Sequence, residues 1–268
     1  MTATGLGMLL VFAASLAAMA VDHSTILGAP TWLKPAKFAI STGVYALTLA
    51  WIFTYLPDRP RQTTIVGWIT AVVMVLEVAI VGVQAARGVT SHFNVATALD
   101  AALFGIMGSA ILVAWGAAIA LTVALFRQRF ADEAFGWALR LGMVLTVMGQ
   151  ATGGLMTNPT QAQLLAARTT RMTVAGAHTV GARDGGPGVP ITGWSREHGD
   201  IRVPHFVGLH AVQLLPALAW AVGPLGSSVR RRRAVFVASA AYAALFVILL
   251  AQALNGQPLL ALPMMVAR

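Results

Sequence analysis

The chain has 268 residues, of which 57% are hydrophobic and only 10% are charged, and its mean hydropathy is +0.75. Soluble domains carry about 25% charged residues, so this composition excludes an ordinary soluble domain and points to a lipid bilayer. The net charge is +9. The cations stand in short loops beside apolar segments, where membrane proteins carry orientation signals, so we expect no nucleic-acid partner. The absence of Cys excludes disulfides and thiolate metal sites.

Seven long apolar segments follow one another along the chain. A transmembrane helix needs roughly 20 apolar residues, and a helix satisfies its own backbone hydrogen bonds in lipid. The sequence therefore predicts an all-α polytopic membrane protein, a bundle of seven transmembrane helices that forms a single domain over residues 1–268. No Lys or Arg precedes Lys34, so we expect the first segment to be a retained span and not a secretory signal. The predicted spans are Leu6–Val21, Phe38–Leu56, Ile65–Ala86, Val95–Phe126, Phe135–Thr157, His205–Val222 and Ala234–Leu254.

Arginines mark three of the short loops between these spans. In a seven-span protein these three loops lie on one side, and the positive-inside rule makes that side cytoplasmic. We therefore expect a cytoplasmic N-terminus and an extracytoplasmic fifth loop. The arginines concerned are Arg59 and Arg61, Arg127 and Arg129, and Arg230 to Arg233.

The fifth loop, residues 158–204, is the one long polar stretch of the chain. Asn158 and Pro159 fit an N-cap followed by Pro at the first helical position, and the sequence TQAQLLAARTTRM that follows predicts a short helix on the membrane surface. Turn residues at 184–188 and an interfacial Trp194 come next. Two interpretations stay open, a plain surface loop and a lid folded over the outer ends of the helices.

Polar side chains gather in the outer half of the predicted spans. Lys37, Ser41 and Tyr45 recur every four residues and share one helix face, as do Glu77 and Gln84, which are seven apart. Ionisable residues inside a membrane usually face a cavity, a partner or a ligand, so we expect these faces to line one pocket. The predicted catalytic residues are Glu77, Asp100 and His210, and the predicted substrate-binding residues are Lys37, Tyr45, Gln84, Arg87, Gln150, Trp194, Arg202 and Gln213.

Histidines near the helix ends raise the question of a cofactor. His23, His92 and His205 are the predicted metal ligands, because neutral imidazole binds zinc, copper or iron. Haem b is an alternative, in which Arg87 and Arg202 hold the propionates. A third hypothesis needs no cofactor and uses Glu77 or Asp100 as a general acid, while buried ion pairs that only fix the helices remain the structural alternative. Retinal is excluded, because the last span contains no Lys.

Four strings, WLKPAKF, QAARGVTSHFN, DGGPGVPITGW and GDIRVPHFVGLHAVQ, resemble a family of uncharacterised bacterial seven-helix membrane proteins, over most of Trp32 to Gln213. The resemblance implies the bacterial inner membrane and carries no activity. From the residues we expect an enzyme, acting on a small or lipid-soluble substrate in the outer pocket with or without a metal or haem. The alternative is a transporter, carrier or sensor of a small anionic ligand. Transporters show repeated halves or broken helices, and the sequence has neither.

Overall fold

The computed structural model describes residues 1–223 and 226–260, and this part of the chain is all-helical. Six of its helices are long and apolar enough to cross a membrane, namely α1, α2, α3, α4, α7 and α8. The helices are α1 (Thr2–Val21), α2 (Leu33–Phe53), α3 (Pro60–Ala86), α4 (Ala98–Arg127), α5 (Glu133–Met156), α6 (Gln161–Ala166), α7 (Arg202–Ala221) and α8 (Ser228–Leu254).

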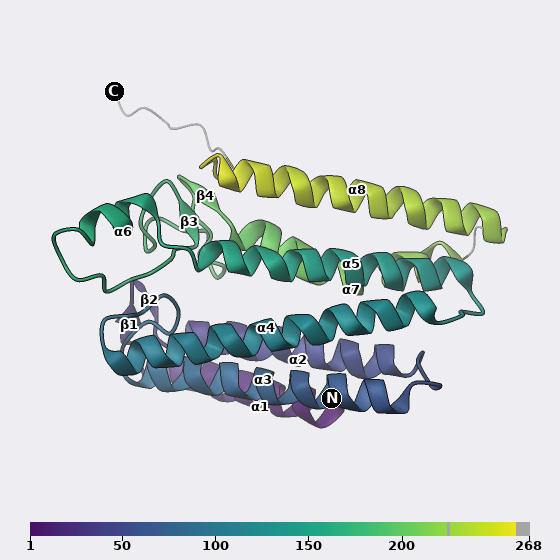
Figure 1. Ribbon diagram of the computed structural model, residues 1–268, viewed down its shortest axis with the longest axis horizontal. Coiled ribbons are helices and arrows are strands. Elements are labelled where there is room, and N and C mark those ends of the chain that lie inside the picture. Colours follow the sequence, from purple (N-terminus) through teal and green to yellow (C-terminus); the bar gives the residue numbers. More distant parts are fainter. Residues whose placement is uncertain (224–225, 261–268) are drawn as a thin grey trace.

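The long helices lie side by side along the longest axis of the molecule, so the bundle has two distinct ends (Figure 1). One end, which we call the loop end, carries α6 and the four short strands. These are β1 (Thr25–Ile26) paired antiparallel with β2 (Ala29–Pro30), and β3 (Thr179–Val180) paired antiparallel with β4 (Gly199–Asp200). The other end, which we call the arginine end, carries the short connections 54–59 and 128–132 and the start of α8.

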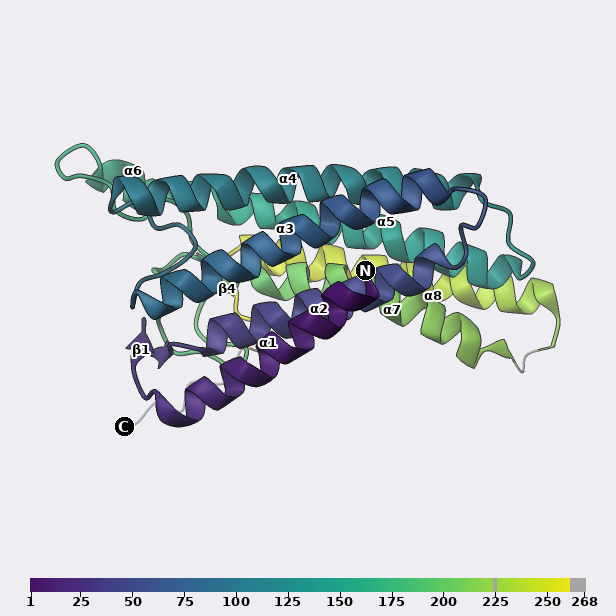
Figure 2. The same cartoon turned by 90° about the horizontal axis from the view of Figure 1, so that it is seen from below.

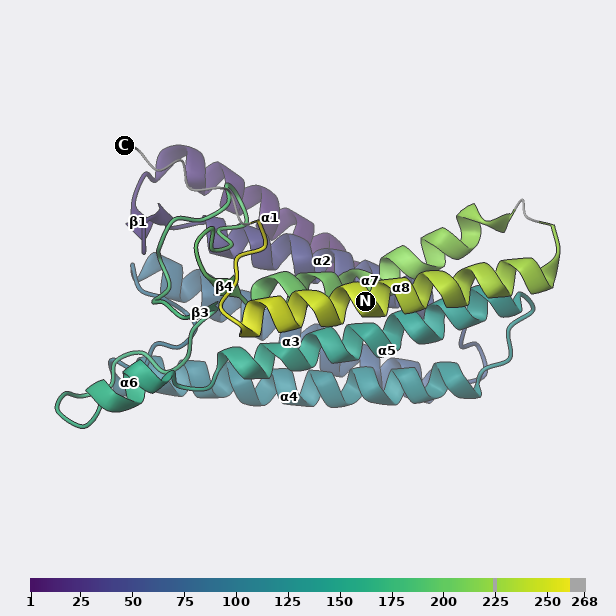
Figure 3. The ribbon, with the colours of Figure 1, turned by 90° about the horizontal axis from the view of Figure 1, so that it is seen from above.

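Two groups of helices make up the bundle. α1 packs on α2 and α2 on α3, and Figure 2 shows α1 crossing α2 on the face seen from below. From above, α8 lies along α5 and α7, and α4 joins the two groups through its contacts with α3 and α5 (Figure 3).

The closest contact joins α5 and α7, and small residues make it possible. A Cβ atom added to Gly149 would lie 2.6 Å from the Cα atom of Gly208, far inside normal contact distance. The Thr146 hydroxyl donates to the Gly208 carbonyl at 3.3 Å and accepts from the Val212 amide at 3.2 Å. Small residues and interhelical hydroxyl bonds are how membrane helices associate where lipid gives no hydrophobic drive.

Buried apolar side chains fill both halves of the bundle, and the largest cluster lies in the arginine half. The arginine half is close-packed around a cluster of fully buried side chains from α2, α4, α5, α7 and the turn after α2, which includes Leu49, Ile52, Leu56, Leu121, Leu125, Leu139, Met143 and Val212. Large apolar side chains cover the outside, for example Trp220 at 82% exposed and Trp68 at 69%. Such a surface suits lipid and would be an aggregation site in water.

Helix ends differ from the predicted ones where polar residues continue or stop a helix. α2 begins at Leu33 and so includes Lys37 in its second turn, five residues before the predicted start. α4 begins at Ala98, because the Thr97 side chain accepts the Asp100 amide and ends the loop there. His92 therefore lies in the loop before α4.

The fifth loop is folded, and its short helix starts later than predicted. α6 begins at Gln161 behind a capping box in which Thr160 and Gln163 each bond the other's backbone amide. The prediction that Asn158 is the N-cap and Pro159 the first helical residue is wrong, because Thr160 takes the cap and the Asn158 side chain instead donates to the Gly154 carbonyl at 3.1 Å. Val174 of the loop forms an antiparallel β-bridge with Asn94, and β4 packs on α8.

Candidate functional site

Asp100, a predicted catalytic residue, is a fully hydrogen-bonded partner of Arg87. Its side chain is 3% exposed, and one carboxylate oxygen accepts from Arg87 Nη1 at 2.7 Å and from Gln84 Nε2 at 2.9 Å. The other oxygen accepts from the Thr97 hydroxyl at 2.6 Å. These bonds fasten the end of α3 to the first turn of α4, where a carboxylate also interacts favourably with the helix dipole. Asp100, Arg87 and Gln84 are thus committed to one another, and the geometry favours a structural role for all three.

Arg202, a predicted substrate-binding residue, is engaged in the same way. It makes a two-point pair with the buried Asp200, at 2.9 Å from Nε and 2.6 Å from Nη2, and Nη2 also donates to the Gly193 carbonyl at 2.6 Å. Asp200 additionally accepts the Ser195 amide at 2.8 Å. A bidentate guanidinium–carboxylate pair fixes both geometry and orientation, so this one closes the second half of the fifth loop onto the start of α7.

Trp194 and His210 meet through Phe206. The Trp194 ring stands edge-on to Phe206 with centroids 5.5 Å apart, and Phe206 lies 4.3 Å from the His210 ring. Trp194 therefore packs on α7, and His210 is half-buried beside an exposed Phe206. Aromatic contacts of this kind place the loop on the helix.

On α2, Lys37 and Tyr45 of the predicted stripe, together with Thr48 one turn further on, face three different elements. Lys37 Nζ donates to the Thr192 carbonyl of the fifth loop at 3.2 Å, and the Tyr45 hydroxyl lies 3.4 Å from Gln150 Nε2 on α5. The Thr48 hydroxyl lies 3.2 Å from the amide of Gln213 on α7. Ser41, expected in the same pocket, is exposed. The stripe thus joins α2 to the other group of helices and to the loop.

His178 and Asp184 form a pair inside the fifth loop that sequence reasoning did not single out. Asp184 accepts His178 Nδ1 at 2.7 Å and the amides of His178 and Thr179 at 3.1 Å and 2.9 Å. Burial alone would raise the pKa of the Asp184 carboxyl, but the hydrogen bonds and charge of His178 bring it well below its usual range. Burial lowers the pKa of His178 from 6.5, against the opposing effect of Asp184. The imidazole is therefore neutral at pH near 7, donates from Nδ1, and keeps an accepting lone pair on Nε2.

A run of ring contacts connects His178 to the helices. The Phe93 ring lies 4.8 Å from His178 and 6.1 Å from His92, and Phe38 lies 5.2 Å from His92 and 5.9 Å from Lys34 Nζ. Burial lowers the pKa of His92 well below 6.5, and the charges of Lys34 and His178 add to that effect. His92 is accordingly a neutral imidazole that contacts Ser91 Oγ at 3.0 Å.

His205, in the first turn of α7, is oriented by the backbone of α5. Its Nδ1 lies 2.8 Å from the Gly149 carbonyl and 3.2 Å from the Thr152 hydroxyl. The carbonyl accepts only, so Nδ1 carries the proton and Nε2 is the free acceptor. His178 is close enough to act electrostatically on His205.

Glu77 is the exception among the buried charged groups. It is 2% exposed in the interior face of α3, and its Oε1 atom has no hydrogen-bond partner in the described part of the chain. Lys34, in the first turn of α2, is close enough for its charge to act on Glu77. Over residues 1–223 and 226–260, Lys34 Nζ also lacks a hydrogen bond or ion pair. We call Lys34, Glu77, His92, His178 and His205 the loop-end cluster.

The predicted metal ligands do not gather. His23 is exposed at the end of α1, whereas His92 and His205 belong to the loop-end cluster. The described residues contain no group of three or more His, Asp or Glu side chains placed to hold one ion. A site for zinc, copper, iron or haem therefore stays a prediction that the geometry does not support.

Sequence reasoning missed Lys34, His178, Asp184 and Asp200 as members of this end of the bundle. Lys34 shares the sequence WLKPAKF with Lys37, and a helix that begins at Leu33 would have placed both cations on it. The other three lie in a loop without periodicity, where no pattern indicates which side chains meet. Comparison with protein-family models, with curated proteins and with solved structures finds no match for this chain.

Proposed function

We propose that this chain crosses the membrane seven times, with α5 as the additional span and the fifth loop as a lid over the loop-end cluster. α5 has 24 residues and runs beside α4, α7 and α8 over the same length (Figure 1). Its one cation, Arg140, need not meet lipid, because it donates to the carbonyls of Leu125 at 3.0 Å and Gln128 at 2.6 Å. The arginine end is then cytoplasmic and the loop end faces outward.

The protein so placed is an enzyme that performs proton transfer on a small or lipid-soluble substrate with an anionic group. One observation carries this proposal: Glu77 is buried and its Oε1 atom has no partner among the described residues, while the carboxylates of Asp100, Asp184 and Asp200 are all hydrogen-bonded. A buried charge without a partner costs several kcal/mol. Glu77 therefore requires a partner from outside the chain, which is what a substrate site provides.

Three members of the loop-end cluster have a role in the proposed proton transfer. Lys34 binds the anionic group, because its ammonium has no hydrogen bond or ion pair among the described residues and lies only over the Phe38 ring. His178 is the general base, since Asp184 fixes its Nδ1 proton and leaves Nε2 to accept one, the arrangement by which an acidic partner orients a catalytic imidazole. Glu77 exchanges a proton with the opposite side of the substrate. The proposal takes no step through a metal or haem.

A carrier for the same ligand is the second candidate, and the depth of Glu77 favours it. Glu77 lies nine residues before Ala86 at the end of α3, which is about 14 Å along the helix axis. That position is near the middle of a membrane, where carriers place coupling groups. Against a carrier, α3 is an unbroken helix there.

Binding can be tested first with octyl phosphate as an amphiphilic anion and octanol as its neutral counterpart. We expect octyl phosphate to raise the thermal unfolding temperature of the detergent-solubilised protein and octanol not to. Lys34→Met should lower the rise by the part that the loop-end site contributes, whereas Arg196→Met, which removes an exposed cation of the fifth loop, should keep it in full. Equal shifts with octanol, or a full shift in Lys34→Met, would refute the anion site.

Turnover separates the enzyme from the carrier. Wild-type protein and the His178→Asn variant are each incubated with a bacterial lipid and metabolite extract, and the products are compared by mass spectrometry. An enzyme with His178 as base gives at least one product that the variant does not form. An extract that is chemically unchanged, although octyl phosphate binds through Lys34, supports the carrier.

A further inference from the structure

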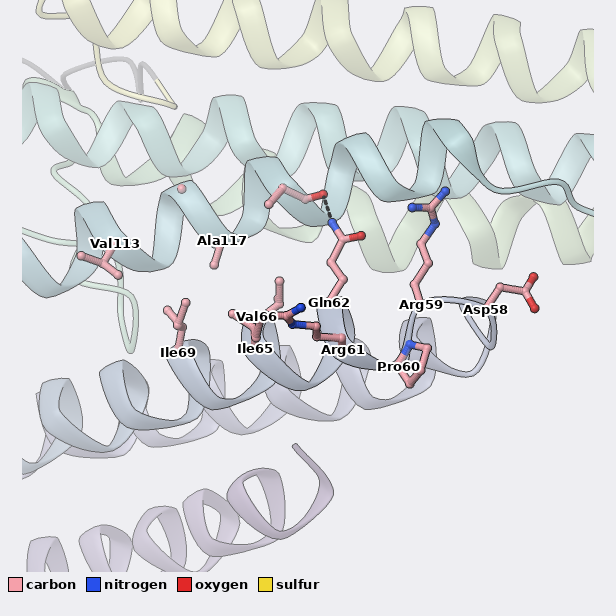
Figure 4. A pocket seen from close by; sticks show the side chains of 12 residues that line it. Asp58, Arg59, Pro60, Arg61, Gln62, Ile65, Val66, Ile69, Val113 and Ala117 are labelled. Carbon is pink, nitrogen blue, oxygen red and sulfur yellow. Dashed lines mark hydrogen bonds between the residues drawn. The ribbon is translucent and has the colours of Figure 1, made fainter.

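A groove opens between α3 and α4 at the arginine end, remote from the loop-end cluster. Its volume is about 690 Å³, and Figure 4 shows its lining side chains. Branched residues of α3 form one wall, and Gly116 and its neighbours on α4 form the other. Nothing lies within 4 Å of a Cβ added to Gly116, so this residue leaves the space between the walls unfilled. The apolar lining is Ile65, Val66, Ile69, Val113, Gly116 and Ala117.

Polar residues close the groove at the end of the bundle. Gln62 Nε2 donates to the Ala120 carbonyl at 3.0 Å and so links the two walls. Arg59 and Arg61 lie just beyond, and Figure 4 shows Arg59 reaching toward α4 and Arg61 lying over the apolar wall. Asp58 also lines this end but points away from the apolar part. The groove is thus apolar along most of its length and cationic at its mouth.

In the described part of the chain, three other arginines of the same end are engaged, unlike the two at the mouth. Arg231 and Arg232 pair with Asp132 and Glu133, and Arg140 caps carbonyls of α4 and its following turn. Within the described ranges, the guanidinium groups at the mouth have neither a hydrogen bond nor an ion pair, and Arg59 Nε is buried without a partner. A second hollow joins Asp58 and Arg59 to Arg127 and Arg129, so four cations and one carboxylate surround the mouth.

The start of α3 adds to this positive field. Arg59 is the N-cap residue and no side chain caps the first amides. Unbonded amides at a helix N-terminus favour an anion, and Arg side chains bind phosphate oxygens in a directed way. The anion that this mouth suits is therefore a phosphate.

We infer that the groove binds an anionic phospholipid, with the phosphate at Arg59 and Arg61 and one acyl chain along the apolar walls. The neighbouring surface supports this choice of ligand. Leu112 and Trp68, on the same two helices, are 66% and 69% exposed, so the groove opens onto a face that suits hydrocarbon. A free phosphate would occupy the mouth and leave the apolar walls uncovered. This inference rests on the membrane location and is independent of the enzyme proposed at the loop end.

Native mass spectrometry of the detergent-solubilised protein tests this site with phosphatidylglycerol, with zwitterionic phosphatidylcholine and with inorganic phosphate. We expect phosphatidylglycerol to stay bound about tenfold more than phosphatidylcholine, and inorganic phosphate to displace little of it. The double variant Arg59→Gln, Arg61→Gln should lose this preference. The matched double variant Arg230→Gln, Arg233→Gln removes two exposed cations from α8 at the same end and should keep it.

A groove variant distinguishes a lipid site from a general attraction of arginines to anions. Gly116→Leu fills the groove without meeting any neighbour of its Cβ, so the helix is expected to fold, which a thermal unfolding measurement verifies. It should lower phosphatidylglycerol retention while Arg59 and Arg61 remain. Three results would overturn the inference: equal retention of the two lipids, equal loss in both arginine double variants, or unchanged retention in Gly116→Leu.

Discussion

Substitution of Gly149 by Ala tests how closely α5 and α7 must approach. An alanine gains about 1 kcal/mol over glycine in a helix interior, but here its Cβ would lie 2.6 Å from the Gly208 Cα atom. Overpacking of this kind costs typically about 1–3 kcal/mol, and backbone atoms have no alternative rotamer. The separation would also stretch the contact of His205 Nδ1 with the Gly149 carbonyl, which measures 2.8 Å. Because the backbone cannot move aside, we take the upper end of that range, about 3 kcal/mol, and expect a net loss of about 2 kcal/mol.

Gly154→Ala is the matched control in the same helix. Nothing lies within 4 Å of a Cβ added there, so only the helix gain of at most about 1 kcal/mol remains. Thermal unfolding in detergent, followed by tryptophan fluorescence, should move down for Gly149→Ala and stay level or move up for Gly154→Ala. If Gly149→Ala unfolds at or above the wild-type temperature, the close α5–α7 contact does not exist as described.

Three further predictions concern charged groups at the loop end. Arg87→Gln should lower the unfolding free energy by about 2 kcal/mol, a value between those for exposed and buried ion pairs, because the Arg87 side chain is 35% exposed. In a double-mutant cycle followed by thermal unfolding, adding Asp100→Asn should recover part of this loss. Additive losses would contradict the ion pair. Burial lowers the pKa of His178 below 6.5, so between about pH 7 and pH 5 the unfolded loop binds protons more readily than the folded loop. Lowering the pH over this range should therefore destabilise the loop and speed its hydrogen exchange, and His178→Gln should remove the effect. Equal exchange at both pH values would refute this prediction. Glu77→Gln should raise the unfolding free energy, because it removes a buried charge without a partner among the described residues, yet abolish turnover. A large loss of stability would instead make Glu77 structural.

The length of the apolar segments predicted the helices well, because a helix that crosses lipid needs roughly 20 apolar residues. Each of the seven predicted apolar segments coincides with one helix of the described structure, and the errors are at the helix ends. An apolar count stops at Lys37, whereas the α2 helix continues through it to Leu33, since a helix can leave the hydrocarbon without ending. The start of α4 was predicted too early, because a local bond between Thr97 and the Asp100 amide, and not hydropathy, decides it.

The candidate site was predicted less well, for a physical reason that Asp184 shows. Helix arithmetic placed Glu77 and Gln84 on one buried face, as the structure has them. It could not show that Asp100 and Arg202 find partners within the chain, because that depends on the folded loop and on contacts between elements. His178 and Asp184 meet across a turn of six residues without periodicity, so only the folded loop reveals their pair.

Partners, more than burial, separate the structural charges from the functional ones at both ends of this bundle. Asp100 and Glu77 are equally enclosed carboxylates, each 2% exposed, yet Asp100 accepts from three side chains, while no hydrogen bond reaches the Glu77 side chain within the described residues. Arg140 and Arg59 differ in the same way at the arginine end. Arg140 donates to two carbonyls, whereas the buried Nε atom of Arg59 has no partner in the part of the chain that the structure describes. Taking a charged group out of water costs several kcal/mol unless something replaces the lost hydration. For Asp100 and Arg140 the chain itself supplies that replacement. For Glu77 Oε1 and Arg59 Nε the described residues supply none, which is why we propose a different ligand at each end of the bundle.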